Sequence, residues 1–138
     1  MADLPGEFPV FPLPGVLLLP RGKLPLRIFE PRYLAMIEDS LQQGRMFGMI
    51  QPDPTAAETE TGPGLFRIGC LWRISSFTET DEGHFLITLT GLIRFAVAQE
   101  LTIRRGYRRV RGDFGPYQAD LDLQQPATNV SRETLLGA

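Results

Sequence analysis

The sequence contains very few of the side chains that most often bind metals or take part in catalysis. Its 138 residues include one cysteine, Cys70, one histidine, His84, and one lysine, Lys23. A single cysteine cannot form an internal disulfide bond, so nothing in the sequence indicates an oxidising compartment. A zinc site built from Cys70 and His84 would have to take its other ligands from carboxylates, which matches none of the usual zinc spacings. We therefore expect no metal and no cofactor.

The motifs of ATP hydrolysis and of serine–lysine peptidases are also missing. Lys23 is not preceded by the glycine-rich segment G-x-x-x-x-G-K-[ST] of a P-loop. A serine–lysine dyad would have to use the same lysine, which lies between Pro20 and Pro25 with no serine nearby. His84 falls where a hairpin would open to solvent, and Cys70 alternates with apolar residues, as a buried side chain does. The sequence therefore predicts a protein that is not an enzyme.

Long apolar segments and a basic N-terminus are absent as well. The longest aliphatic run, Val16–Leu19, is far shorter than the roughly 20 residues of a membrane-spanning helix. Asp3 and Glu7 precede Pro9, unlike the basic and then apolar start of a signal peptide. The formal charge of -2 is too small to indicate a class of binding partner. A composition of 43% hydrophobic and 22% charged residues is typical of a soluble globular domain. We expect a cytoplasmic protein with no membrane partner.

Extended, alternating segments are what the sequence has in quantity. Seven of the twelve prolines fall within the first 31 residues. Strands at Phe8–Leu13 and Lys23–Phe29 should therefore be short or lie at a sheet edge, because proline cannot donate to the ladder. Stronger alternation marks Phe66–Phe77 and Phe85–Val97, which are separated by a turn at Asp81–Gly83. These two segments predict a long antiparallel hairpin.

One helix and a curled sheet complete the predicted fold. Pro31 suits the first position of a helix that ends near Gly44. Gly91 interrupts the apolar face of its strand, where a missing side chain usually marks a bulge that lets a sheet curl. The polar segment Pro52–Gly64 is predicted to be a loop, and Tyr107–Phe114 is predicted to be a further strand. The sequence predicts a mainly β (α+β) fold with one or two short helices, curled into a pseudo-barrel.

The chain divides into a domain at residues 1–118 and a C-terminal segment at residues 119–138. Ser131 is placed to cap a helix, with Glu133 in its first turn. Only one or two turns fit before the chain stops, and such a short helix is not stable alone. We interpret residues 119–138 as a linker and the start of a truncated helical region.

Several short strings occur in the order typical of one known family. Together, between residues 8 and 114, they resemble the N-terminal substrate-binding domain of Lon proteases, in its small stand-alone bacterial form. No single string is specific, so the resemblance depends on their number and order. The strings are Pro9–Leu13 (PVFPL), Leu17–Pro20 (LLLP), Leu24–Leu26 (LPL), Ile28–Tyr33 (IFEPRY), Arg45–Gln51 (RMFGMIQ), Ile68–Cys70 (IGC), Thr88–Phe95 (TLTGLIRF) and Tyr107–Val110 (YRRV).

This resemblance implies both a fold and a function. The implied fold is a PUA-like pseudo-barrel with one helix packed across an end, followed in longer relatives by a helical bundle. The implied function is recognition of unfolded or partly folded polypeptide. This chain would carry out that recognition without the ATPase and the peptidase of the full protease. A link to protein quality control follows from the same resemblance.

The candidate polypeptide-binding residues are Val16, Leu17, Leu18 and Leu19. A proline-flanked aliphatic segment cannot easily be central in a sheet, so it either packs in the core or leaves apolar surface for a partner. For the neighbouring segment Ile28–Tyr33 we favour packing over binding. In that interpretation Phe29 forms a hydrophobic staple at the helix entrance.

An RNA-binding module is the alternative function. Strand alternation would place Arg105, Tyr107, Arg109 and Arg111 on one face, where they could bind phosphates. PUA-like barrels include RNA-binding members, and arginine beside an aromatic residue suits RNA. Yet the chain is acidic overall, and charge on an edge strand also prevents aggregation between sheets. We therefore prefer polypeptide as the partner over nucleic acid.

Overall fold

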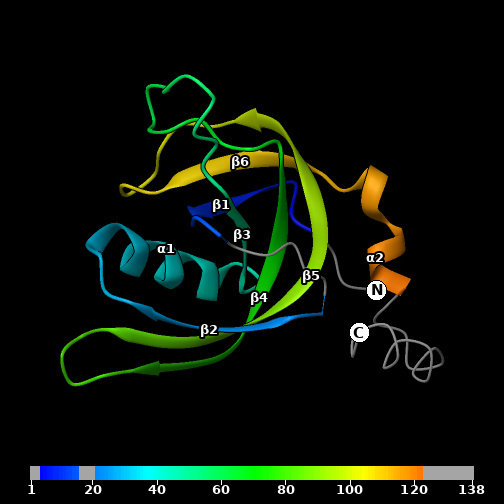
Figure 1. Ribbon diagram of the computed structural model, residues 1–138. Helices are drawn as coiled ribbons and strands as arrows, with labels where there is room; N and C mark the ends of the chain where they lie inside the picture. Colours follow the sequence, from blue (N-terminus) through cyan, green and yellow to red (C-terminus); the bar gives the residue numbers. More distant parts are fainter. Residues whose placement is uncertain (1–3, 16–20, 123–138) are drawn as a thin grey trace.

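A computed structural model describes residues 4–15 and 21–122 of the chain (Figure 1). Most of the ordered elements are strands, as the sequence predicts. The elements are β1 (Glu7–Pro12), β2 (Lys23–Ile28), α1 (Pro31–Gln42), β3 (Met46–Ile50), β4 (Ile68–Glu79), β5 (Phe85–Glu100), β6 (Arg108–Asp113), a 3-10 turn (Gly115–Tyr117) and α2 (Ala119–Asp122).

The six strands form one sheet that closes on itself. Their order is β2-β5-β4-β3-β1-β6, and β6 also pairs with β5. Closure is possible because β5 has 16 residues and serves two neighbours in turn. Its first half pairs with β2, and its last part, from Ala96 to Glu100, pairs with β6. The predicted pseudo-barrel is confirmed, with β2 as a sixth strand outside the closed ring.

The predicted hairpin and its bulge are both present. β4 and β5 pair antiparallel along most of their length, and their tip projects at the lower left in Figure 1. Trp72 pairs with Gly91 while Leu71 pairs with Ile93, so β5 has one additional residue at Leu92. An extra residue increases the local twist of a strand. This bulge lies between the part of β5 that pairs with β2 and the part that pairs with β6.

Two phenylalanine rings fill the inside of the barrel. Phe8 of β1 and Phe95 of β5 meet edge to face, with ring centroids 4.9 Å apart. Glycines face these rings: a Cβ atom on Gly48 would lie 2.9 Å from both of them, and one on Gly69 would lie 2.7 Å from Phe95. The same is true of Gly112, where a Cβ would lie 2.7 Å from Phe8. The barrel is narrow enough that its large side chains require neighbours with none.

A second apolar cluster lies between α1 and the other face of the sheet. α1 begins at Pro31, as expected, and buries Tyr33, Met36 and Ile37. These residues pack in one cluster with Phe47 and Trp72 of β3 and β4. Because both faces of these central strands are covered, β3 and the first half of β4 are buried almost throughout. α1 thus lies against the barrel wall close to the end of β2.

The last described element, α2, is joined to β5 by one carboxylate. Asp120 is 4% exposed and accepts hydrogen bonds from the backbone N–H and the guanidinium of Arg94, at 2.9–3.0 Å. Arg94 also stacks over the ring of Tyr117, 4.9 Å from its centroid. The predicted domain boundary at residue 118 stays a prediction, and the helix start expected at Ser131 lies outside the described residues.

Candidate functional site

An apolar groove of about 350 Å³ lies where the ends of β1 and β2 meet the first turn of α1. One wall is the end of β1 and the residue after it, Phe11–Leu13, and the other is Leu26–Glu30. Arg32 and Tyr33 of α1 complete the lining. Figure 1 shows α1 above β2, with the chain passing from the end of β2 into the first turn of α1. We call this hollow the β1–β2 groove.

Aromatic side chains form the floor and one edge of the groove. Phe11 stacks on Tyr33 with ring centroids 4.3 Å apart, and the guanidinium of Arg32 lies 4.6 Å from the centroid of the Tyr33 ring. Burial raises the pKa of the Tyr33 hydroxyl, so this phenol stays neutral and acts as part of the apolar floor. Phe29 is different, because 59% of it is exposed. The exposed Phe29 ring extends the apolar surface beside the hollow.

Charged side chains border the groove. Arg27 donates to Glu82 at 2.7 Å and to Nδ1 of His84 at 3.1 Å, which links β2 to the tip of the β4–β5 hairpin. Arg32 donates to Glu30 at 3.2 Å. Both ion pairs are about half exposed, so each contributes little to stability and exchanges readily for another partner. The groove therefore has an apolar floor and a polar, adaptable rim.

The position of Phe29 corrects one expectation from the sequence. We expected a hydrophobic staple packed at the helix entrance, but the exposed Phe29 ring lies 5.9 Å from the ring of His84 instead. Ile28 and Tyr33, at the two ends of the same segment, are buried as expected. The segment therefore combines packing residues with surface residues. Strand alternation could have indicated that Phe29 faces away from Ile28, but not that a groove lies beside it.

The candidate residues Val16, Leu17, Leu18 and Leu19 lie outside the described residues. The chain leaves the groove wall at Leu13 and is described again from Arg21. Contact between this aliphatic segment and a polypeptide stays a prediction.

The four residues of the alternative anion site do not share one strand face. β6 begins at Arg108, and Arg105 has a φ of 50° in the turn before it, so strand alternation does not extend back to Arg105 and Tyr107. Tyr107 is 1% exposed and its hydroxyl donates to Asp39 of α1 at 2.7 Å. Burial and this hydrogen bond raise the pKa of Tyr107 to about 12. The expectation of one shared face is wrong, whereas anion binding by these residues stays a prediction.

Two of the three arginines of the alternative site are paired with carboxylates. The hydrogen bonds that Arg105 donates to Glu38 and Asp39 raise the pKa of Arg105, and the hydrogen bond that Arg111 donates to Glu7 holds the pKa of Glu7 below its usual value. Arg109 donates to Thr102. The ion pairs join Arg105 to Glu38 at 2.9 Å and to Asp39 at 2.6 Å, and Arg111 to Glu7 at 2.8 Å. A phosphate would have to displace these carboxylates before it could bind.

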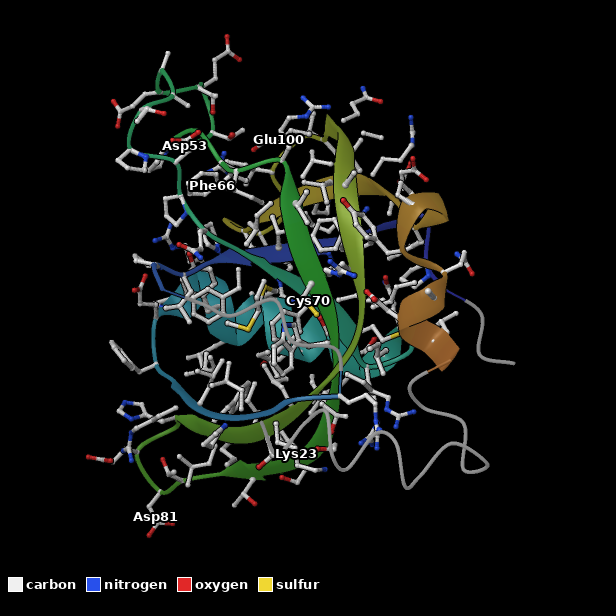
Figure 2. All side chains as sticks on the ribbon, turned by 45° about the vertical axis from the view of Figure 1, so that its right-hand side comes forward. Lys23, Asp53, Phe66, Cys70, Asp81 and Glu100 are labelled. Carbon is white, nitrogen blue, oxygen red and sulfur yellow. The ribbon has the colours of Figure 1, made fainter. Side chains whose placement is uncertain are left out.

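Other residues singled out in the sequence form no reactive site. Cys70 is fully buried, as expected, and burial raises the pKa of its thiol to about 12, which leaves it protonated and unreactive at neutral pH. Figure 2 shows Cys70 in the middle of the molecule. Residues 4–15 and 21–122 contain no cluster of three or more His, Cys, Asp or Glu side chains that could hold a metal ion. In the same part of the chain no helix has the length and hydropathy needed to cross a membrane.

The described residues form a small closed β-barrel with an apolar, charge-bordered groove. Residues 7–134 match the family model of the ATP-dependent protease La (LON) substrate-binding domain. The chain therefore belongs to the family of Lon substrate-binding domains, as its sequence motifs had indicated.

Individual relatives agree with this assignment. Lon protease 2 of Myxococcus xanthus is 27% identical over 111 residues, which are 80% of this chain but 13% of that protein. Protein cereblon of Danio rerio is 30% identical over 110 residues, or 76% of this chain and 24% of that protein. The crystal structure of a Lon N-terminal domain protein from Xanthomonas campestris superposes with a TM-score of 0.61 and 29% identity, covering 78% of this chain and 59% of that one. This chain thus spans a minor part of the Lon protease and cereblon sequences and somewhat over half of the Xanthomonas structure.

Proposed function

We propose that this chain binds segments of unfolded or partly folded polypeptide without catalysing a reaction on them. The observation that carries this proposal is the β1–β2 groove, whose apolar floor opens beside a Phe29 ring that is 59% exposed. A client side chain that enters the groove removes its own apolar surface and that of Phe29 from water together. Membership of the Lon substrate-binding family supports the same function.

The dimensions of the groove suit polypeptide better than a large cofactor. Its volume of about 350 Å³ is near the lower end of the roughly 300–1,000 Å³ usual for pockets that enclose drug-sized ligands. Such a volume accommodates a few side chains of an extended segment, while the rim residues Arg27, Glu30 and Arg32 remain in contact with solvent. We propose that Val16–Leu19, which follows the Phe11–Leu13 wall in sequence, adds apolar surface for the client.

We infer a role in protein quality control from the family rather than from any residue of this chain. The family is that of the substrate-binding domain of the ATP-dependent protease La (LON). The proposed role is cytoplasmic recognition of clients with exposed apolar segments, and the groove supplies the contact for it.

The proposal is tested by comparing two exposed phenylalanines. Phe29→Ser removes the aromatic edge of the groove, and Phe66→Ser is the matched comparison because Phe66 is 43% exposed and lines a separate hollow of about 510 Å³. Figure 2 places Phe66 at the end of the molecule opposite Lys23 of β2. The probe is reduced, carboxymethylated lactalbumin, which stays unfolded, and binding is measured by fluorescence anisotropy. Phe29→Ser should weaken binding about fivefold or more, equivalent to about 1 kcal/mol or more, while Phe66→Ser binds like the unmodified protein.

A melting control accompanies this comparison. Both variants should melt at the temperature of the unmodified protein, because both rings are largely exposed. A third variant, Leu17→Ser, tests the aliphatic segment, with the same melting control because a core leucine could cost about 2–5 kcal/mol when lost. Absence of binding by the unmodified protein, or weakening by Phe66→Ser and not by Phe29→Ser, would overturn the proposal.

A further inference from the structure

One edge of β2 has no partner strand among the described residues. β2 stands at the end of the sheet and, within the part of the chain that the structure describes, pairs only with β5. The backbone N–H of Gly91 donates to the carbonyl of Gly22 at 2.8 Å, which fixes the hydrogen-bonding phase of this antiparallel pair. Because such bonds alternate along a strand, Leu24, Leu26 and Ile28 bond to β5, while Lys23, Pro25 and Arg27 direct their backbone polar groups away from it. The position of Pro25 agrees, since a proline nitrogen has no hydrogen to offer β5.

The β1–β2 groove borders the last three residues of this edge, Leu26–Ile28, and continues along the two residues after β2. Leu26, Arg27 and Ile28 all line it, although side chains within a strand alternate between the two faces. Consecutive lining residues are expected only where a groove follows the edge of a strand rather than one face. The opposite wall, Phe11–Leu13, is also consecutive. Pairing of β1 with β6 stops at Val10, so that side of β1 is likewise unpaired among the described residues from Phe11 on.

Charge along the edge favours one kind of occupant. Lys23 and Arg27 lie on β2 and Arg32 lies beside it on α1, whereas Glu30 is the acidic residue that lines the groove. Lys23 forms no ion pair with any residue between 4–15 or 21–122. Arg27 pairs with Glu82 and Arg32 with Glu30, so among the described residues of this border Lys23 carries the charge without an ion-pair partner, and that charge is positive. An acidic segment would be attracted to it, and a basic one repelled.

We propose that the groove binds its polypeptide as an added β-strand, paired with the free edge of β2, and prefers apolar segments that carry acidic residues. This inference rests on the proposed function and specifies its geometry. The N–H groups of Lys23 and Arg27 donate to the client backbone, and the carbonyls of Lys23, Pro25 and Arg27 accept from it. Main-chain bonds are independent of client sequence, which suits a domain that must recognise many unfolded chains. Alternate client side chains enter the groove and contact Phe29.

The backbone contribution is isolated by a pair of variants at Arg27. Arg27→Pro removes the outward N–H together with the side chain, and Arg27→Ala removes only the side chain. Proline is compatible with an edge strand at a position whose N–H faces away from the sheet, so the ladder with β5 is retained. The probe is a peptide of leucines alternating with serines, flanked by aspartates. Arg27→Pro should bind it roughly threefold to tenfold more weakly than Arg27→Ala, the effect of one lost hydrogen bond.

Amide hydrogen exchange measured by NMR gives an independent readout on the unmodified protein. In the free protein, the outward amides of Lys23 and Arg27 should exchange rapidly, and those of Leu24 and Leu26 slowly because they are bonded to β5. Saturation with the acidic peptide should slow exchange at Lys23 and Arg27. The counterpart peptide with lysines in place of aspartates should bind more weakly, and the difference should shrink as salt is added.

The outcomes separate this inference from the proposed function. If Phe29→Ser weakens client binding but the bound peptide leaves exchange at Lys23 and Arg27 unchanged, strand addition is wrong and the groove still binds polypeptide. If neither Phe29→Ser nor the Arg27 variants affect binding, both proposals fail. Equal affinity for the acidic and basic peptides overturns the charge preference.

Discussion

The inside of the barrel is so closely packed that single residues determine its diameter. Gly48 and Gly69 come from neighbouring strands, and both face the ring of Phe95. The barrel closes at this diameter because these positions carry no side chain. Any added atom must push either an aromatic ring or the backbone of the next strand, and a closed ring of strands has little freedom to move.

Gly69→Ala should destabilise the protein. The new Cβ would lie 2.7 Å from the carbonyl oxygen of Met49 and 2.7 Å from the Phe95 ring, so backbone as well as side chain must shift. We expect a loss of about 1–3 kcal/mol in the free energy of unfolding, as for other overpacked cores. Urea denaturation measures this, and Gly6→Ala is the control because a Cβ there meets nothing within 4 Å. A Gly69→Ala variant as stable as Gly6→Ala would show that the barrel yields more easily than its geometry indicates.

At the residue scale, the sequence predicts a feature when that feature is determined by the residue's own strand, and not when it is determined by residues of other strands. The burial of Cys70 was predictable because it follows the alternation of its own strand, and the bulge beside Gly91 because that glycine interrupts the apolar face of its strand. The need for glycine at positions 69 and 112 was not, since the rings that approach them come from other strands. The exposure of Phe29 has the same origin: its surroundings are supplied by β1 and the hairpin tip rather than by its sequence neighbours.

Elements were easier to predict from sequence than their pairings. The hairpin of β4 and β5, the helix beginning at Pro31 and the proline-rich first strands all follow from local patterns. The pairing of β6 with β1, which closes the barrel, joins segments far apart in the chain and leaves no local signal. The groove depends on that closure and on the free edge of β2, so its location could not be derived from spacing alone.

The attachment of α2 to the barrel should depend on pH. Burial alone would raise the pKa of Asp120, but hydrogen bonds from the Arg94 side chain and backbone outweigh it and hold the pKa below its usual value. A carboxylate whose pKa is lower in the folded state stabilises that state above its unfolded pKa and loses this effect as pH falls through the folded pKa. We expect Asp120→Asn to cost about 1–3 kcal/mol at neutral pH, since the variant leaves Arg94 without its charged partner.

Comparison across pH isolates this effect from the other carboxylates. Glu7 and Glu100 also have lowered pKa values, but they are present in both proteins and cancel in the difference. Urea denaturation between neutral pH and pH values below the usual 3.8 of an aspartate should show the two stabilities converging as the solution is acidified. A difference that is constant with pH would mean that the Asp120 contribution is steric rather than electrostatic.

At the scale of the whole molecule, the charges are arranged in pairs rather than in patches of one sign. The 14 basic and 16 acidic side chains nearly balance, and the arginines near β6 face carboxylates from β1, α1 and β5. Arg108 is buried, paired with Glu100 at 2.8 Å, and also donates to the carbonyl of Pro63 at 2.9 Å. Such pairing stabilises contacts between elements and reduces the positive potential that a polyanion would meet.

RNA binding should therefore be weak, and its salt dependence shallow. A protein that contacts several phosphates loses affinity steeply with salt, with a slope of about 0.7 per phosphate on single strands. We expect no such slope for a labelled oligouridine in anisotropy titrations at increasing salt, because Arg105 and Arg111 are already bound to carboxylates. The triple variant with Gln at Arg105, Arg109 and Arg111 should bind as weakly as the unmodified protein, provided that circular dichroism shows the fold intact. Tight, salt-sensitive binding that this variant abolishes, without affinity for unfolded clients, would replace polypeptide by RNA as the partner.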